Sequence, residues 1–135
     1  MIFDRQTLFS NAQAITATAQ STDQIDTGPI ARSRDIGRGA EIPLRIQVTE
    51  TFNNLTSLAI AYQVADDTAF SVNLTTVWTT TVLLAGLTAG AVIVPDELQR
   101  GSNRRYHRLL YTVTGSAPTT GRITAGLTMG NQSNE

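Results

Sequence analysis

Hydrophobic and polar residues alternate along most of this chain, and the clearest case is segment 41–50. Its aliphatic residues are Ile42, Leu44, Ile46 and Val48. Successive side chains of a strand point to opposite faces of a sheet, so this pattern predicts a strand with one buried face. A shift of one residue would expose all four aliphatic side chains, which should fix the register. Pro43 has no N–H to donate and is expected at the beginning of the strand or on a sheet edge.

The same alternation predicts strands over 58–64, 72–84, 105–114 and 123–129, with shorter ones over 14–21 and 91–94. Three rows of residues are predicted to point inward: Leu58, Ile60, Tyr62 and Val64; His107, Leu109, Tyr111 and Val113; Ile123, Ala125, Leu127 and Met129. Asp96–Gln99 is predicted as one helical turn, and no longer segment has an apolar period of 3.6. About eight strands joined by short turns predict an all-β fold. The expected architecture is a two-sheet antiparallel β-sandwich of the jelly-roll type.

The length of 135 residues predicts one folded domain. We expect an N-terminal arm over residues 1–12, a jelly-roll domain over 13–130 and a polar tail over 131–135. The arm contains the large apolar residues Phe3, Leu8 and Phe9. Large apolar side chains exposed on such an arm would promote aggregation, so they are expected either to pack under the sandwich or to dock on a neighbouring molecule.

Composition removes several kinds of chemistry. The chain has no cysteine, which excludes a disulfide framework, a thiolate nucleophile and a cysteine-ligated zinc site. The net charge is −1, so no overall field attracts nucleic acid or an anionic membrane. The N-terminus does not resemble a secretory signal, and the apolar stretches are too short to span a bilayer. We expect a soluble protein that is made in a cytoplasm.

Candidate catalytic groups are few. His107, the single histidine, lies on a predicted apolar strand face and is interpreted as structural. Asp66 and Asp67 are interpreted as turn residues, because a calcium loop needs more oxygen ligands at defined spacing. A pair of carboxylates for glycoside hydrolysis forms in space, and the sequence neither supports nor removes one. We therefore expect no enzyme activity, no metal and no cofactor.

All ten basic residues are arginines, and most of them form two groups. Arg32, Arg34 and Arg38 lie in a glycine-containing loop, while Arg104, Arg105 and Arg108 follow Arg100 beside Tyr106. Arginine and an aromatic residue can bind single-stranded nucleic acid, but arginine without lysine is more typical of planar pairing with carboxylates at protein interfaces. Contacts at a protein interface are the favoured interpretation, and solvated arginines remain an alternative for any one of them.

The order of several segments resembles that of the Bbp16-type capsid cement proteins of tailed phages. The segments that carry the resemblance are Phe9–Ala19, Ser21-Thr22, Ile25-Asp26, Arg34–Gly37, Asp66–Ser71, Tyr106–Val113 and Ile123–Leu127. They are framework residues rather than a catalytic motif, so the resemblance depends on their order and their extent.

This resemblance implies a jelly-roll protein on the outer surface of the assembled phage head. It would clamp neighbouring major capsid subunits as a homo-oligomer, a dimer or a trimer, without nucleic-acid or membrane partners. The residues expected at the interface with the capsid or another subunit are Phe3, Leu8, Phe9, Arg32, Arg34, Arg38, Arg104, Arg105 and Arg108. Two alternatives stay open: a carbohydrate-binding jelly-roll module on the virion surface, and an enzyme on a cupin-like sandwich. The first needs exposed aromatics, and the second needs more metal-binding histidines than one.

Overall fold

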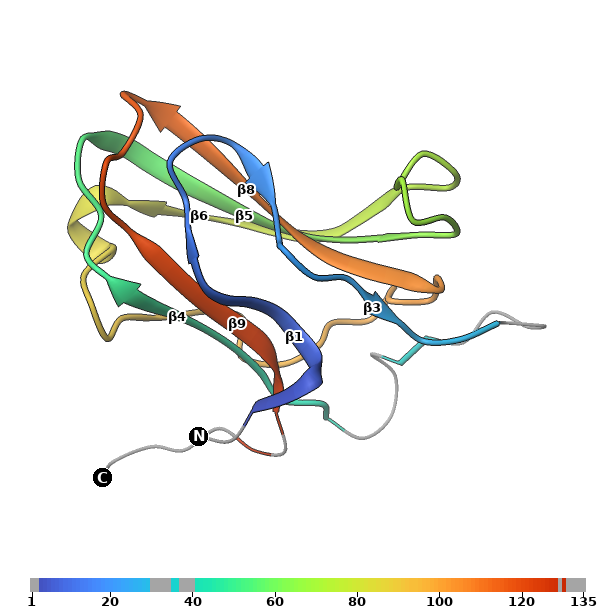
Figure 1. Cartoon of the computed structure of the whole chain (residues 1–135). Coiled ribbons are helices and arrows are strands. Elements are labelled where there is room, and N and C mark those ends of the chain that lie inside the picture. The colour runs from blue at the N-terminus through green and yellow to red at the C-terminus, as the bar shows by residue number, and fades with distance from the viewer. Residues whose placement is uncertain (1–2, 30–34, 37–40, 129, 131–135) are drawn as a thin grey trace.

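The computed structural model describes residues 3–29, 35–36, 41–128 and 130. Within these residues the chain forms nine strands and one 3-10 turn (Figure 1). The strands are β1 (Phe3–Ala14), β2 (Ala19–Gln20), β3 (Ile25–Asp26), β4 (Leu44–Glu50), β5 (Leu55–Ala65), β6 (Thr75–Leu83), β7 (Val92–Ile93), β8 (Tyr106–Gly115) and β9 (Arg122–Thr128). The 3-10 turn, η1 (Leu84–Gly86), follows β6.

The strands form two antiparallel sheets that face each other (Figure 1). The four-stranded sheet has the order β1-β9-β4-β7. The five-stranded sheet has the order β2-β8-β5-β6, and β3 also pairs with β8. The predicted all-β fold with two antiparallel sheets is confirmed, and its jelly-roll form stays a prediction.

The strand predicted from the clearest alternation is β4. Leu44, Ile46 and Val48 are fully buried between the sheets, and burial of each such side chain contributes about 1.5–3 kcal/mol. Pro43 precedes the strand and pairs with Glu97, as expected for a residue that cannot donate within a ladder.

The centre of the core is Tyr62 on β5. Its ring contacts Phe9 edge-on, with 5.6 Å between ring centroids, and it also contacts Trp78 and His107. The inward rows predicted for β5 and β8 are confirmed, since their members are fully buried except for the half-buried Val113. Pairs of aromatic rings in this arrangement stabilise a core beyond their buried area.

The N-terminal segment differs from the expectation. Residues 3–14 form β1, which pairs with β9 from Phe3 opposite Thr128 to Ala14 opposite Arg122, so the boundary expected at residue 12 falls inside a strand. The ladder contains several register shifts, and Ala12 has a φ of 47°. These irregularities break the period of two, which is why the sequence gives little sign of this strand.

Two other local predictions were wrong. The strand predicted over 14–21 is a bend followed by the two-residue β2, because its small exposed side chains at 16–18 offer little area to bury. Asp96–Gln99 is not helical. Leu98 is buried, and its N–H donates to the carbonyl of Ile42 at 2.9 Å, so pairing with the segment before β4 replaces the hydrogen bonds of a helical turn.

Gly121 allows the chain to pass beside the buried ring of Phe52. Its φ is 132°, and a Cβ at this position would overlap the Phe52 ring. We expect Gly121→Ala to lower the free energy of unfolding by about 3–5 kcal/mol, from backbone strain and overpacking together. Gly90→Ala is the matched control, since Gly90 has a φ of 91° with open space around it and should lose only about 1–2 kcal/mol. Urea denaturation measures both, and equal losses would contradict the role of Phe52.

Candidate functional site

The first predicted arginine group, Arg32, Arg34 and Arg38, lies outside the described residues. Asp35 and Ile36, between Arg34 and Arg38, are described, and both are hydrogen-bonded to the loop before β8. The carboxylate of Asp35 accepts hydrogen bonds from the N–H groups of Gly101, at 2.7 Å, and Ser102, at 3.1 Å. Asp35 is therefore attached to the loop that precedes the second arginine group.

In the second group, Arg104 and Arg105 are paired within the chain. Arg105 forms a two-pronged ion pair with Asp26, at 2.7 and 2.9 Å, and Arg104 lies 3.1 Å from the carboxylate of Asp66. The hydrogen bond to Asp26 raises the pKa of Arg105, and the same bond lowers the pKa of Asp26. These pairs are partly exposed, so water and salt weaken the attraction between the charges.

Arg108 is held differently from its two neighbours. Its Nε donates to Oε1 of Gln63 at 2.9 Å, and one terminal nitrogen donates to Oε1 of Gln20 at 2.6 Å. The guanidinium carbon lies 4.2 Å from the centre of the Phe70 ring. Burial lowers the pKa of Arg108. The group is therefore a partly desolvated cation, fixed by two neutral amide oxygens and an aromatic face.

The apolar residues of the N-terminal segment are separated by the fold. Phe9 is fully buried and Leu8 nearly so, which is the first of the two placements left open by the sequence. Both lie in the interior of this chain and present no surface to a partner. Phe3 is half-buried at the start of β1, and among the described large apolar residues of this segment it is the one that reaches the surface.

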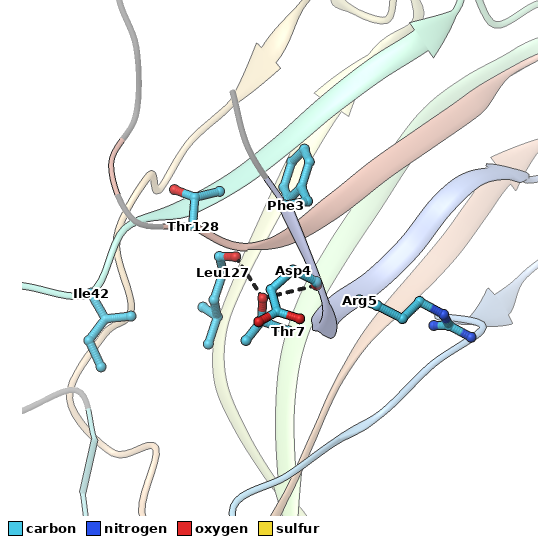
Figure 2. A pocket seen from close by; sticks show the side chains of 7 residues that line it. All are labelled: Phe3, Asp4, Arg5, Thr7, Ile42, Leu127 and Thr128. Carbon is cyan, nitrogen blue, oxygen red and sulfur yellow. Dashed lines mark hydrogen bonds between the residues drawn. The ribbon is translucent and has the colours of Figure 1, made fainter.

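Phe3 lines a pocket of about 620 Å³ at the corner where β1 and β9 meet (Figure 2). The other lining residues are Asp4, Arg5, Thr7, Ile42, Leu127 and Thr128. The Thr7 hydroxyl donates to the Leu127 carbonyl at 3.0 Å, and Arg5 extends away from the others to pair with Asp23 at 2.9 Å. The pocket thus lies at a strand junction where Thr7 of β1 is bonded to Leu127 of β9.

His107 is fully buried beneath the second arginine group, which confirms its interpretation as a structural residue. Its Nε2 lies 2.8 Å from the carbonyl oxygen of Arg104, which can only accept, so Nε2 carries the proton. Nδ1 then accepts a hydrogen bond from the Tyr62 hydroxyl at 2.8 Å. Burial lowers the pKa of His107 to about 4, so the ring is neutral at pH 7.

The acidic pair Asp66-Asp67 forms the predicted turn. The Asp67 carboxylate accepts hydrogen bonds from the N–H groups of Ser71 and Val72 and from the Ser71 hydroxyl. These bonds lower the pKa of Asp67. Across the described residues, no cluster of three or more histidine or acidic side chains is arranged to hold a metal ion.

The aromatic residues are placed in the core more than on the surface. Tyr62 and Tyr111 are fully buried, and Trp78 and Tyr106 are half-buried on different strands.

In the described part of the chain, no helix has the length and apolar character needed to cross a bilayer.

The residues that fix Arg108 were missed by the sequence analysis. Gln20, Gln63 and Phe70 come from three separate segments, so their meeting depends on the pairing of β8 with β2 and β5. One feature of the sequence could have pointed to Gln63. Gln63 interrupts the small residues on the outward side of β5, where the other positions are Ser57, Ala59, Ala61 and Ala65.

Burial of a neutral histidine makes stability depend on pH. The unfolded chain binds a proton at His107 near pH 6.5 and the folded chain only near pH 4, so stability is lost as the pH falls through this window. We expect the free energy of unfolding to drop by about 3 kcal/mol from this residue between pH 7 and pH 4. Urea titrations across this range measure the drop. In His107→Gln the slope should become flatter, and an unchanged slope would contradict the assignment.

The chain matches the model of one protein family over most of its length. The model of the Bbp16 family matches residues 9–127, from the buried part of β1 to the end of β9. A comparison with curated proteins finds no match. The matched segment covers most of the 135 residues and includes strands of both sheets, so the chain belongs to the Bbp16 family of bacteriophage proteins.

Proposed function

We propose that this protein is a virion component that binds the outside of the assembled phage head and clamps neighbouring major capsid subunits. Membership of the Bbp16 family, over residues 9–127, is the observation that carries the proposal. The role requires a stiff body and contact surfaces and does not require turnover of a substrate.

The fold supports this role physically. Two sheets enclose a continuous core, and the pairing of β5 with β8 extends from Leu55 to Ala65. A body of this kind transmits load between its contacts because close-packed interiors deform little. A clamp between capsid subunits has to resist separation of those subunits, so stiffness is the property that the role requires.

In this proposal the clamp is strong because one oligomer makes several linked contacts with the shell. We propose that the protein acts as a dimer or a trimer, in which each copy makes a modest contact with the shell. Linking such contacts raises overall affinity by about 10²–10⁴ when all of them can form together. Because the oligomer binds the assembled shell, it stabilises that state by mass action.

The predicted interface residues support the proposal to different degrees. Phe3 and Arg108 reach the surface and are retained. Arg104 and Arg105 are already paired with acidic residues of the same chain and are weaker candidates. Arg32, Arg34 and Arg38 remain part of the proposal as residues outside the described structure.

The two alternatives receive less support. A carbohydrate-binding face needs exposed aromatic rings, whereas Tyr62 and Tyr111 are buried in the core and Trp78 and Tyr106 are only half-exposed. A cupin-like metal site would be built on histidines, and the single histidine is bonded to Tyr62 and to a backbone carbonyl.

The proposal predicts selective binding to assembled heads. Purified protein should bind saturably to expanded heads that lack it and should bind free capsid subunits far more weakly, because the linked contacts exist only on the shell. Co-sedimentation of the protein with heads measures this, and heads bearing the protein should release DNA at a higher temperature than bare heads. Equal binding to shells and free subunits, or no binding to shells, would refute the clamp.

The proposal also predicts the mass of the free protein. Analytical ultracentrifugation at micromolar concentration should give a species of two or three times the chain mass of 14.5 kDa. The same measurement on heads should show one bound oligomer per site. A chain that stays monomeric both in solution and on heads would contradict the linked-contact mechanism.

A further inference from the structure

The outer face of β5, β6 and β8, three strands of the five-stranded sheet, is nearly free of charge. The outward row of β5 consists of Ser57, Ala59, Ala61, Gln63 and Ala65. The register places Ala61 between Thr79 of β6 and Leu110 of β8, and it places Ala59 between Thr81 and Thr112. Most of this row is itself buried, and only Ala59 is half-buried. The surface open to a partner is therefore formed by the flanking residues, which are the exposed Thr79 and Thr81 of β6 and the half-buried Leu110 and Thr112 of β8.

Arg108 is the one charged residue among the outward-facing residues of β5, β6 and β8. It lies opposite Gln63, next to the neutral rows, and its guanidinium is fixed by Gln20, Gln63 and the ring of Phe70. Only two of its five N–H groups have partners among the described residues. The remaining N–H groups are available to an acceptor that approaches this face.

A partly desolvated guanidinium gains most from a negatively charged acceptor. Arg104 and Arg105 obtain one from Asp66 and Asp26, whereas the partners of Arg108 in the described residues are neutral amide oxygens. Fixing the planar group in advance reduces the entropy lost when a carboxylate binds with two parallel hydrogen bonds. The surroundings of Arg108 therefore fit a carboxylate on the partner.

The neutral surroundings favour a protein as the source of that carboxylate. A nucleic-acid groove follows a charged backbone with repeated unpaired cations. On this face Arg108 is the one charged residue of β5, β6 and β8, and the neighbouring Arg105, which lies over the Tyr106 ring, is already paired with Asp26. Protein interfaces have the opposite character, with few charges in their centre and arginine enriched among those that remain.

We infer that the outer face of the five-stranded sheet is the surface that docks on the protein shell of the head, and that Arg108 pairs there with an aspartate or glutamate of the shell. This inference rests on the proposed function and names the surface that performs it. The four strands of the path β2-β8-β5-β6 span roughly 15–20 Å across the sheet.

The first test reverses the charge of Arg108. Arg108→Glu should weaken binding to expanded, protein-free heads by about thirtyfold or more, because it places two carboxylates opposite each other. Arg100→Glu is the matched control, since Arg100 is exposed on the loop before β8 and the charge change is the same. Arg108→Lys should lose part of the affinity, because lysine keeps the charge and lacks the planar pair of donors.

The second test leaves Arg108 intact and changes the neutral part of the face. Thr79→Glu places a buried charge in the contact and should weaken head binding at least tenfold. Thr49→Glu is the matched control, because Thr49 is an exposed strand residue on β4 of the other sheet. Thermal unfolding of each variant separates loss of binding from loss of folding.

The outcomes distinguish the surface from the function. If the unchanged protein does not bind heads, the proposed function fails. If it binds, and both Arg108→Glu and Thr79→Glu bind as well as their controls, this surface is refuted while the function stands. Binding of the unchanged protein to single-stranded DNA that Arg108→Glu abolishes, with head binding unaffected, would assign Arg108 to phosphate and overturn the inference.

Discussion

The antiparallel pairing of β5 with β8 is the constraint on which the rest of the molecule depends. In this register Tyr62 and His107 point into the core, and their neighbours Gln63 and Arg108 point out. A shift of one residue in either strand would bury Arg108 without a partner and expose the ring of Tyr62, at a cost of several kcal/mol. One register therefore fixes both the packed interior and the arrangement of the outer face.

The parts of the fold that the sequence predicts well are those with large aliphatic side chains at a strict period of two. β4, β5, β8 and β9 have that pattern, and each was predicted within a few residues. β1 lacks it, because Leu8, Phe9 and Ser10 are buried in succession at a register shift. Local pattern could not reveal this, since the irregular segment is held by β9, more than a hundred residues away.

The contacts of the arginines also depend on residues that are far away in the sequence. Composition alone marked the arginines as notable. Their roles differ because of partners far away in sequence: Asp26 is 79 residues from Arg105, Asp66 is 38 residues from Arg104, and Gln63 is 45 residues from Arg108. Asp26 and Asp66 neutralise Arg105 and Arg104, whereas Gln63 is neutral and only orients Arg108. Sequence spacing carries no sign of that difference.

The burial of His107 in its neutral form has a thermodynamic consequence for folding itself. The unfolded chain holds a proton on this ring in mildly acidic solution, and the folded core excludes it, so forming the native structure near pH 5 expels a hydrogen ion into the solvent. The heat of unfolding measured there would include the ionisation heat of whichever buffer takes up or supplies that ion. Acetate and histidine buffers at one pH should thus give different calorimetric enthalpies for the same molecule.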